Sequence, residues 1–349
     1  METLRSSNVD SLLTPDRFLW AVGIEDTFIT SPWPATGRTL DEYELTQHYK
    51  RWREDVDLFA ELGVKFVRYG IPWHRVNPAR GQWDWSFPDR SLSRLLDLGI
   101  DPVVDLVHYG LPPWINDAYL NPEFPEIMAE YAGRVAERYS GRIHCYTPLN
   151  EPRVTAWYCG KLGWWPPARR GWRGFLELMN SVCRGIVKTV HRLTEVDPEI
   201  LPVQVDATDL YESADATLQE EVNRRQEIVF LALDLVSGRV TPEHSLYRWL
   251  LRNGMKESDL EWFQENKISH AFIGINLYPL FSRKVLSRSP HGLRTRMPYS
   301  TADIIDRLAE LYWKRYHVPL FISETASEGS ISRRETWLKD SVEAAEALV

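Results

Sequence analysis

An alternation of short apolar segments with helical segments, repeated seven times, constrains the fold of this chain more than any other feature. The apolar segments are nearly continuous, which is typical of parallel strands that are buried on both faces. Polar residues follow each of them. The expected strands are, in chain order, 17–24, 64–69, 102–107, 143–146, 201–206, 271–278 and 318–323. This pattern predicts an α/β protein of the (β/α)8 TIM-barrel class.

The segments between these strands carry apolar residues at three- and four-residue steps, which is the period of a helix packed on one face. The expected helices are 41–62, 90–98, 125–139, 175–193, 218–236, two shorter pieces up to 266, then 302–316 and 333–348. An open doubly wound sheet is the alternative, but no Gly-x-Gly-x-x-Gly turn follows the first strand. No linker or low-complexity stretch interrupts the pattern, so residues 1–349 are expected to form a single domain.

The pattern supplies seven strands, whereas a barrel of this class has eight. The residues after Glu324 are expected to form a loop and a helix. An open parallel edge would leave backbone N–H and C=O groups unpaired. The chain could be truncated, a partner segment could close the barrel, or the open edge could be tolerated. We favour truncation, with a fused or partner domain beyond the C-terminus.

Composition excludes several classes of function. The net charge is −8 and no basic block is present, which argues against a nucleic-acid partner. No apolar run is long enough to span a membrane. Three cysteines do not suggest a disulfide framework, and no Cys-x-x-Cys or His-x-x-x-His spacing suggests a metal site, so no cofactor or metal is expected. These features predict a cytoplasmic enzyme.

Aromatic residues are abundant, with 15 Trp, 15 Tyr and 12 Phe. They could form a large core, or they could line a pocket that stacks the faces of sugar rings. The candidates for such stacking are Trp73, Trp157, Trp164 and Trp165.

The residues at the expected strand ends carry the chemistry. In a barrel these ends open on one pocket. The polar or aromatic residues found there are Glu25, Asp26, Arg68, Trp73, His108, Tyr109, Asn150, Glu151, Asp206, Asn276, Tyr278 and Glu324. Buried charged groups are costly unless they are paired, so this ring indicates either a catalytic site or a structural salt-bridge network. Two carboxylates, Glu151 and Glu324, on two strand ends are what cleavage of a glycosidic bond requires.

The segment 149–152, Leu-Asn-Glu-Pro, resembles the acid/base motif of glycoside hydrolase family 1, the β-glucosidase family. Five further matches occur in the order that the family has: 18–20 on the first strand, Arg68 with Trp73, His108, 274–278, and Ser323 with Glu324. The resemblance extends from about residue 17 to 326. The chain is similar to a divergent short-form member, of the kind found joined to a sugar-nucleotide reductase domain.

The resemblance implies a retaining β-glycosidase that hydrolyses O-glycosidic bonds of a small carbohydrate or glycoside through a covalent glycosyl-enzyme intermediate. Glu151 would be the acid/base and Glu324 the nucleophile, with carboxyl groups about 5–5.5 Å apart. Arg68 and Tyr278 would keep Glu324 ionised, and Asn276 belongs to the same supporting set.

The resemblance also implies the residues that bind substrate. Asn150 would bind the sugar 2-hydroxyl and His108 another hydroxyl, with Trp73 as a stacking surface. The family usually has a glutamine that grips the sugar where this chain has Phe28, and Glu25 is expected to take over that contact. Tyr109 stands where the family usually has tryptophan, and the family's Glu-Asn-Gly after the nucleophile reads Glu-Thr-Ala at 324–326.

Three alternatives remain open at the level of sequence. A transglycosylase would use the same two carboxylates with a sugar acceptor in place of water. A catalytically silent barrel would bind a carbohydrate or a protein. A metal-dependent hydrolase could use Asp206, His108 and Glu324 as ligands, although no His-x-His pair ends the first strand.

Overall fold

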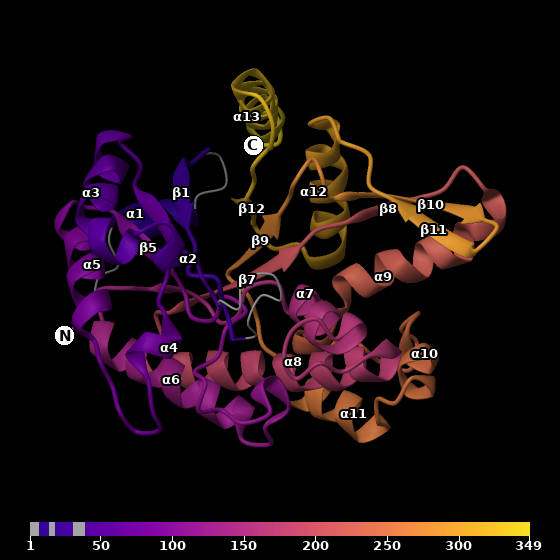
Figure 1. Cartoon of the computed structure of the whole chain (residues 1–349), viewed down its shortest axis with the longest axis horizontal. Helices are drawn as coiled ribbons and strands as arrows, with labels where there is room; N and C mark the ends of the chain where they lie inside the picture. Colours follow the sequence, from indigo (N-terminus) through magenta and orange to yellow (C-terminus); the bar gives the residue numbers. More distant parts are fainter. Residues whose placement is uncertain (1–6, 14–17, 31–38) are drawn as a thin grey trace.

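A seven-stranded parallel sheet forms the centre of the computed structural model, which describes residues 7–13, 18–30 and 39–349 (Figure 1). Neighbouring strands follow the order of the chain, as in a barrel, and every printed pairing in this sheet is parallel. The strands are β1 (Ala21–Ile24), β4 (Phe66–Gly70), β5 (Asp101–Asp105), β6 (Cys145–Thr147), β7 (Leu201–Ala207), β9 (Phe272–Asn276) and β12 (Leu320–Glu324).

Helices connect successive strands and surround the sheet (Figure 1). The longer ones are α3 (His48–Glu61), α5 (Ser86–Asp97), α6 (Phe124–Tyr139), α8 (Gly171–Val196), α9 (Gln219–Val236), α12 (Asp303–Tyr316) and α13 (Ile331–Glu346). The shorter ones are α1 (Ser7–Leu12), α2 (Glu42–Leu45), α4 (Trp73–Val76), α7 (Pro152–Ala156), α10 (Tyr247–Arg252) and α11 (Glu257–Glu265). In the ranges given above, none of these helices has the length and apolarity to cross a membrane.

Alternate residues of each strand face opposite sides of the sheet, and both sides are buried. Phe66, Val203 and Phe272 pack together inside the barrel. The intervening residues, such as Val67 and Val104, pack outward against the helices. This explains why the strands read as continuous apolar runs, and it leaves the polar residues for the strand ends.

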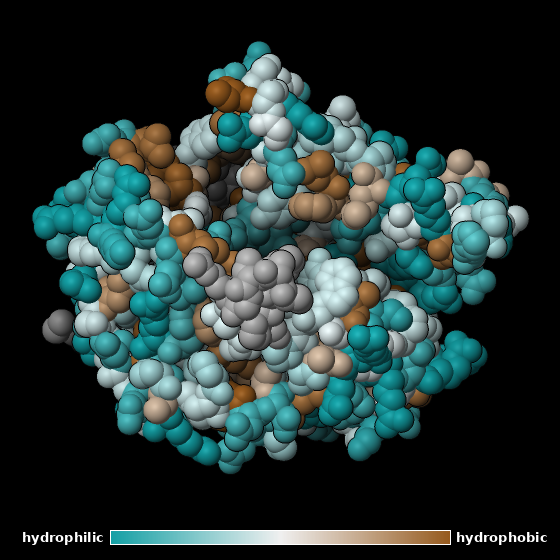
Figure 2. Space-filling view, in the orientation of Figure 1, coloured by the Kyte–Doolittle hydropathy of each residue, from teal (hydrophilic) through white to brown (hydrophobic). Residues whose placement is uncertain are grey.

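The barrel has an open seam between β1 and β12. Each of these strands pairs on one side only, and they do not pair with each other; within the described ranges no eighth strand joins the sheet. The strands nevertheless approach closely, since a Cβ atom added to Gly23 on β1 would lie 4.0 Å from the Ser323 carbonyl on β12. Figure 2 shows a hollow in the surface between the regions of β1 and β12. The predicted TIM-barrel class with a missing eighth strand is confirmed.

Local structure departs from expectation in three places. The first strand begins at Ala21 rather than at Arg17, which lies outside the described residues. The helix expected over 41–62 is two helices, α2 and α3, because Gln47 adopts a left-handed backbone conformation (φ 62°) between them. A small second sheet was not predicted. It contains β8 (Leu210–Glu212), β10 (Arg283–Ser289) and β11 (Gly292–Arg296). A separate two-stranded sheet pairs β2 (Phe28–Ile29) with β3 (Leu40–Asp41).

Candidate active site

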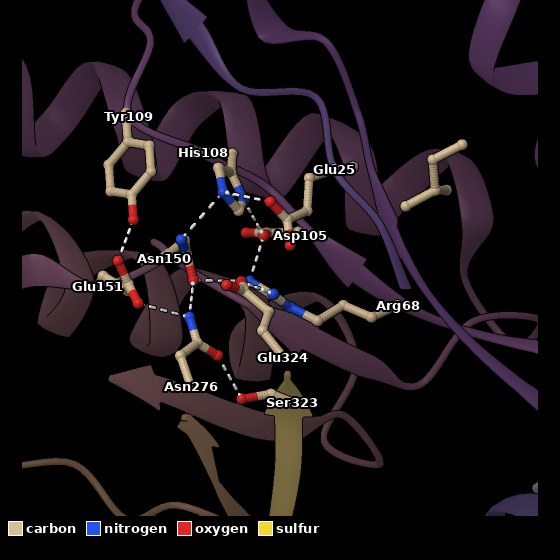
Figure 3. Close-up of polar contacts among 12 residues, drawn as sticks. Glu25, Arg68, Asp105, His108, Tyr109, Asn150, Glu151, Asn276, Ser323 and Glu324 are labelled. Atoms are coloured by element: carbon tan, nitrogen blue, oxygen red, sulfur yellow. Dashed lines mark hydrogen bonds and ion pairs between the residues drawn. The ribbon is translucent and has the colours of Figure 1, made fainter. Parts of the chain in front are cut away.

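The carboxyl ends of the barrel strands gather most of the predicted site residues into one hydrogen-bonded cluster (Figure 3). The residues that the structure brings together are Glu25, Arg68, His108, Tyr109, Asn150, Glu151, Asn276, Tyr278 and Glu324. They come from strands that are distant in the sequence, so the cluster exists only in the folded barrel.

The backbone of Asn150 and Glu151 is held between two strands. The Asn150 N–H donates to the Val107 carbonyl (2.9 Å), and the Glu151 N–H donates to the Val205 carbonyl (3.1 Å). Glu151 adopts a left-handed conformation with φ 47°, which is unfavourable for a residue with a side chain. Strained residues of this kind persist where the surrounding structure fixes them, and they concentrate at functional sites.

Glu324 ends β12, and its two carboxylate oxygens face different donors. Oε1 accepts a hydrogen bond from Arg68 Nη1, and Oε2 accepts one from the Tyr278 hydroxyl (2.6 Å). Its backbone carbonyl accepts from the Leu277 N–H (2.9 Å), which continues the pairing with β9. Glu324 is therefore oriented by one charged and one neutral donor.

Arg68, on β4, is the cation at the centre of the cluster. It is buried, and Nη2 donates both to Asp105 Oδ2 (2.5 Å) and to Asn150 Oδ1 (2.8 Å). Burial alone would lower its pKa, but the carboxylates of Asp105 and Glu324 raise the pKa of Arg68 above its ordinary value. The guanidinium stays charged and links Glu324 on β12 to Asn150, which follows β6.

Glu151 lies in a different electrostatic environment from Glu324. Burial, followed by repulsion from Glu324, raises the pKa of Glu151 from 4.5 to about 7, although hydrogen bonds from Tyr109 and Asn276 oppose this rise. Asn276 Nδ2 donates to Glu151 Oε1 (2.8 Å), and the Tyr109 hydroxyl donates to Oε2. A carboxyl group with such a pKa can hold a proton near neutral pH and can also release it.

His108 lies between two carboxylates. Its Nδ1 is 2.9 Å from Asp105 Oδ2, and its Nε2 is 3.4 Å from Glu25 Oε2. Burial lowers the pKa of the ring, but Asp105 and Glu25 together raise the pKa of His108 well above its ordinary value. The Asn150 amide nitrogen, 3.1 Å from Nε2, favours the neutral ring, but two charged partners outweigh one neutral amide.

Glu25 is the most open acid of the cluster, with 29% of its side chain exposed. Burial would raise its pKa, yet His108 and Arg68 lower the pKa of Glu25 to about 2, so it is ionised. Glu25, His108 and Glu324 also have ligand atoms within 4.8 Å of one another, a spacing that could hold a metal ion. Arg68 already pairs with Glu324, and the positive charges of Arg68 and His108 oppose a cation there.

Three residues from the strand ends, Asp26, Trp73 and Asp206, lie outside this cluster. Asp26 is buried, and its carboxylate lies against Gly70. Trp73 is 2% exposed and stacks in the core on Tyr131 (ring centroids 4.6 Å apart, 7° between planes), so its faces are not available to a sugar. This placement does not agree with the prediction that Trp73 binds substrate. Val205 packs inside the barrel, so Asp206 faces the opposite side of β7, and its oxygens find no hydrogen-bond partner among the described residues. Asp206 therefore does not join His108 and Glu324 as a ligand.

Two aromatic substitutions relative to the family pattern have clear positions. Phe28 is 8% exposed, and its ring stacks on the ring of His74 with centroids 3.7 Å apart. It offers no side-chain polar atom to a sugar. Tyr109 instead faces Glu151, and its ring begins a row that continues through Trp165 (5.2 Å), Tyr158 (4.6 Å) and the exposed Trp164 (5.3 Å).

Asp105 and Ser323 belong to the cluster, although they were not among the predicted site residues. Asp105 bridges Arg68 and His108, and the Ser323 hydroxyl donates to Asn276 Oδ1 (2.6 Å). An aspartate within an otherwise apolar strand was the signal available for Asp105. Ser323 lies next to Glu324 in the sequence, but nothing in its sequence context predicts its hydrogen bond to Asn276.

The fold resembles solved structures of known enzymes. A structure titled "Family 1 b-glucosidase from Thermotoga maritima" superposes with a TM-score of 0.82, covering 96% of this chain and 85% of that chain at 20% identity. At this identity the likeness supports the fold alone.

Sequence relatives point to the same family over shorter stretches. Thermostable beta-glucosidase B from Thermobispora bispora is 32% identical over 176 residues, which are 43% of this chain and 36% of that protein. Beta-glucosidase 1B from Phanerodontia chrysosporium is 37% identical over 129 residues, which are 33% of this chain and 24% of that protein. The matched segments thus span about a quarter to a third of these relatives. The model of the family described as glycosyl hydrolase family 1 matches residues 21–278, most of the chain, and the protein therefore belongs to glycosyl hydrolase family 1.

Proposed function

We propose that this protein is a retaining β-glycosidase that cleaves O-glycosidic bonds, with Glu151 as acid/base and Glu324 as nucleophile. The observation that carries the proposal is the contrast between the two carboxyl groups. Glu151 is buried, with its pKa raised to about 7, whereas Glu324 accepts hydrogen bonds from Arg68 and Tyr278. A retaining mechanism needs one protonated carboxyl group and one carboxylate.

In the first step, Glu324 attacks the anomeric carbon while the bond to the leaving oxygen breaks. The leaving oxygen takes the bonding electron pair and the proton that Glu151 supplies, which leaves Glu151 as a carboxylate. Loss of that proton is favoured once Glu324 is covalently bound, because its negative charge no longer raises the pKa of Glu151.

In the second step, water attacks the anomeric carbon and displaces Glu324. The water proton passes to Glu151, which restores both carboxyl groups to their starting states. Two inversions at one carbon give overall retention of configuration.

The polar groups beside Glu324 would bind the sugar ring. Asn150 is assigned to the 2-hydroxyl, and His108 and the more open Glu25 to neighbouring hydroxyls. Asn276 supports Glu151 through its amide. The row from Tyr109 to Trp164 provides apolar ring faces on the side of Glu151, where the leaving group must lie.

Labelling with a panel of 2-deoxy-2-fluoro glycosides tests the nucleophile, because the fluorine slows the second step and traps the intermediate. Mass spectrometry should place the label on the peptide that contains Glu324. Glu324→Ala should abolish labelling and turnover, whereas Glu328→Ala, which changes an exposed glutamate close by in the chain, should preserve both. Carbohydrate binding without any label in the wild type would instead indicate a catalytically silent barrel.

Transglycosylation is the second candidate, and the aromatic row favours it, since stacked rings could hold an acceptor sugar. Product analysis with an aryl glycoside and increasing acceptor sugar distinguishes the two. A transglycosylase would release the aryl group faster than free sugar, whereas a hydrolase would release them equally.

We also propose that residues 1–349 are one domain, that the chain takes small glycosides rather than nucleic acid, and that it acts in the cytoplasm. The net charge of −8 argues against a nucleic-acid substrate. The three buried free cysteines support a location in the cytoplasm. The unpaired edges of β1 and β12 support a fused or partner segment at the seam.

A further inference from the structure

Both oxygens of the Glu151 carboxyl group already face hydrogen-bonding groups of the protein. Oε1 faces the Asn276 amide and Oε2 faces the Tyr109 hydroxyl (Figure 3). An acid catalyst needs a route from its proton to the leaving oxygen, and in this arrangement each oxygen already has one protein partner. The question is which oxygen carries the proton.

The hydrogen bonds of Asn276 answer that question. Its Nδ2 also donates to Asn150 Oδ1 (3.2 Å), an oxygen that accepts from Arg68, so Nδ2 is the atom that faces Glu151 Oε1 (2.8 Å), while Oδ1 accepts from the Ser323 hydroxyl (2.6 Å). An amide nitrogen only donates, so Oε1 accepts, and when Glu151 is protonated its proton resides on Oε2. In that state the Tyr109 hydroxyl, which donates to Oε2 of the ionised carboxylate, accepts from it instead. The proton of Glu151 therefore points at the Tyr109 oxygen.

Tyr109 is held in this position at a conformational cost. Its φ is 65°, the left-handed region that an aromatic residue rarely adopts. The Tyr119 hydroxyl donates to the Tyr109 carbonyl (2.7 Å), and the Phe28 N–H donates to the carbonyl of the preceding His108 (3.3 Å). At the next residue, Gly110 lies so close to Phe28 that an added Cβ atom would be 2.3 Å from its carbonyl oxygen. Contacts on both sides thus fix a strained residue against the acid.

Tyr109 also lies on the open side of Glu151. Glu151 is 6% exposed, whereas Tyr109 is partly exposed and its ring contacts Trp165 in the aromatic row that reaches the surface. A leaving group bound along this row would meet the Tyr109 hydroxyl before it met Glu151.

We propose that Tyr109 relays the proton between Glu151 and the leaving oxygen, an inference that rests on the proposed glycosidase function. As the glycosidic bond breaks, the leaving oxygen takes the electron pair and the Tyr109 hydroxyl proton. The Glu151 Oε2–H bond breaks at the same time, and its proton binds the Tyr109 oxygen, which stays neutral. In the second step the attacking water gives its proton to Tyr109, which passes its own proton to Glu151.

The test compares kcat/KM over a series of aryl β-glycosides whose leaving groups differ in acidity. A dinitrophenyl leaving group needs no protonation, whereas phenol does. Tyr109→Phe should lower kcat/KM by about 100-fold for the phenyl glycoside and by less than about 2-fold for the dinitrophenyl glycoside, matching the pattern of Glu151→Gln. Tyr109→Trp, which keeps an aromatic ring without the hydroxyl, should behave in the same way.

The matched control is Tyr247→Phe, since Tyr247 also donates its hydroxyl to a glutamate, Glu257 (2.8 Å), but outside the site. It should leave the leaving-group dependence unchanged, and thermal melting should show that all variants fold. If the Tyr109 variants keep the wild-type dependence while Glu151→Gln does not, Glu151 protonates the leaving group directly and the relay is overturned. Absence of both turnover and the Glu324 label in the wild type would overturn the glycosidase function itself.

Discussion

At the scale of single residues, Arg68 compensates two buried carboxylates at once. Arg68→Ala would leave Glu324 without its cation and Asp105 with His108 alone, because both carboxylates pair with the same guanidinium. Removing one member of a buried ion pair typically costs about 3–5 kcal/mol, so we expect the free energy of unfolding to fall by that amount. Urea denaturation measures it.

The control for this substitution is Arg94→Ala, which breaks a partly exposed pair with Asp57 (2.7 Å). That change should cost less than about 1 kcal/mol. If both variants lose the same free energy of unfolding, burial does not make the ion pairs of Arg68 contribute more than the pair of Arg94.

The raised pKa of Glu151 predicts the pH dependence of catalysis. Glu151 must be protonated in the free enzyme. Its ionisation should therefore leave kcat/KM unchanged below about pH 7 and should lower it about tenfold per pH unit above the Glu151 pKa of about 7. Glu151→Gln should lose this alkaline limb. A limb centred near the ordinary carboxyl value of 4.5 would contradict the environment described for Glu151.

Most residues of the site could be predicted because each ends a strand, and the barrel brings strand ends together. Their partners were less predictable. Asp105 is one charge inside an apolar strand, and the contact of Tyr109 with Glu151 depends on two left-handed backbone conformations that the sequence does not signal. Trp73 follows a strand end as the pattern required, but the helix α4 that begins with it turns the ring into the core.

At the scale of elements, the contact between β9 and β12 depends on a residue without a side chain. A Cβ atom on Gly274 would lie 2.6 Å from Ser323 Oγ and 2.9 Å from the Phe321 ring. Gly274→Ala should therefore push the two strands apart and lower the free energy of unfolding by about 1–3 kcal/mol, with loss of activity. Denaturant unfolding of the variant provides the measurement.

Gly23→Ala is the matched control, because the nearest atoms would lie 4.0 Å from its Cβ, an ordinary contact. Its stability should stay close to that of the wild type. If Gly274→Ala is equally neutral, β9 and β12 are not packed as tightly as these distances indicate.

The strands of the main sheet were predictable since burial on both faces makes them continuous apolar runs. The hairpin of β10 and β11 was not, because its residues are largely exposed and β11 is exposed throughout. Backbone hydrogen bonds, rather than an apolar pattern, define this hairpin. The break between α2 and α3 was hidden for a related reason, since the apolar period continues across Gln47.

At the scale of the whole molecule, the strands of the main sheet differ in the number of neighbouring strands with which they pair. β5, β6 and β7 each pair with two neighbours, whereas β1 and β12 each pair with one. Amide hydrogens in β1 and β12 should therefore exchange with solvent faster than those in the three central strands. Hydrogen–deuterium exchange followed by mass spectrometry resolves these segments, and uniform protection across the sheet would contradict this view.

The open seam also has a consequence for durability. Glu324 is carried by β12, an outermost strand, whereas the backbone of Asn150 and Glu151 is held between the segment that follows β5 and strand β7. On warming, Glu324 should lose its alignment while most helices are still intact, so the proposed activity should be lost before the fold unfolds. Inactivation should then occur at a lower temperature than the loss of helical circular dichroism, and coincident transitions would show that the last strand melts only with the rest.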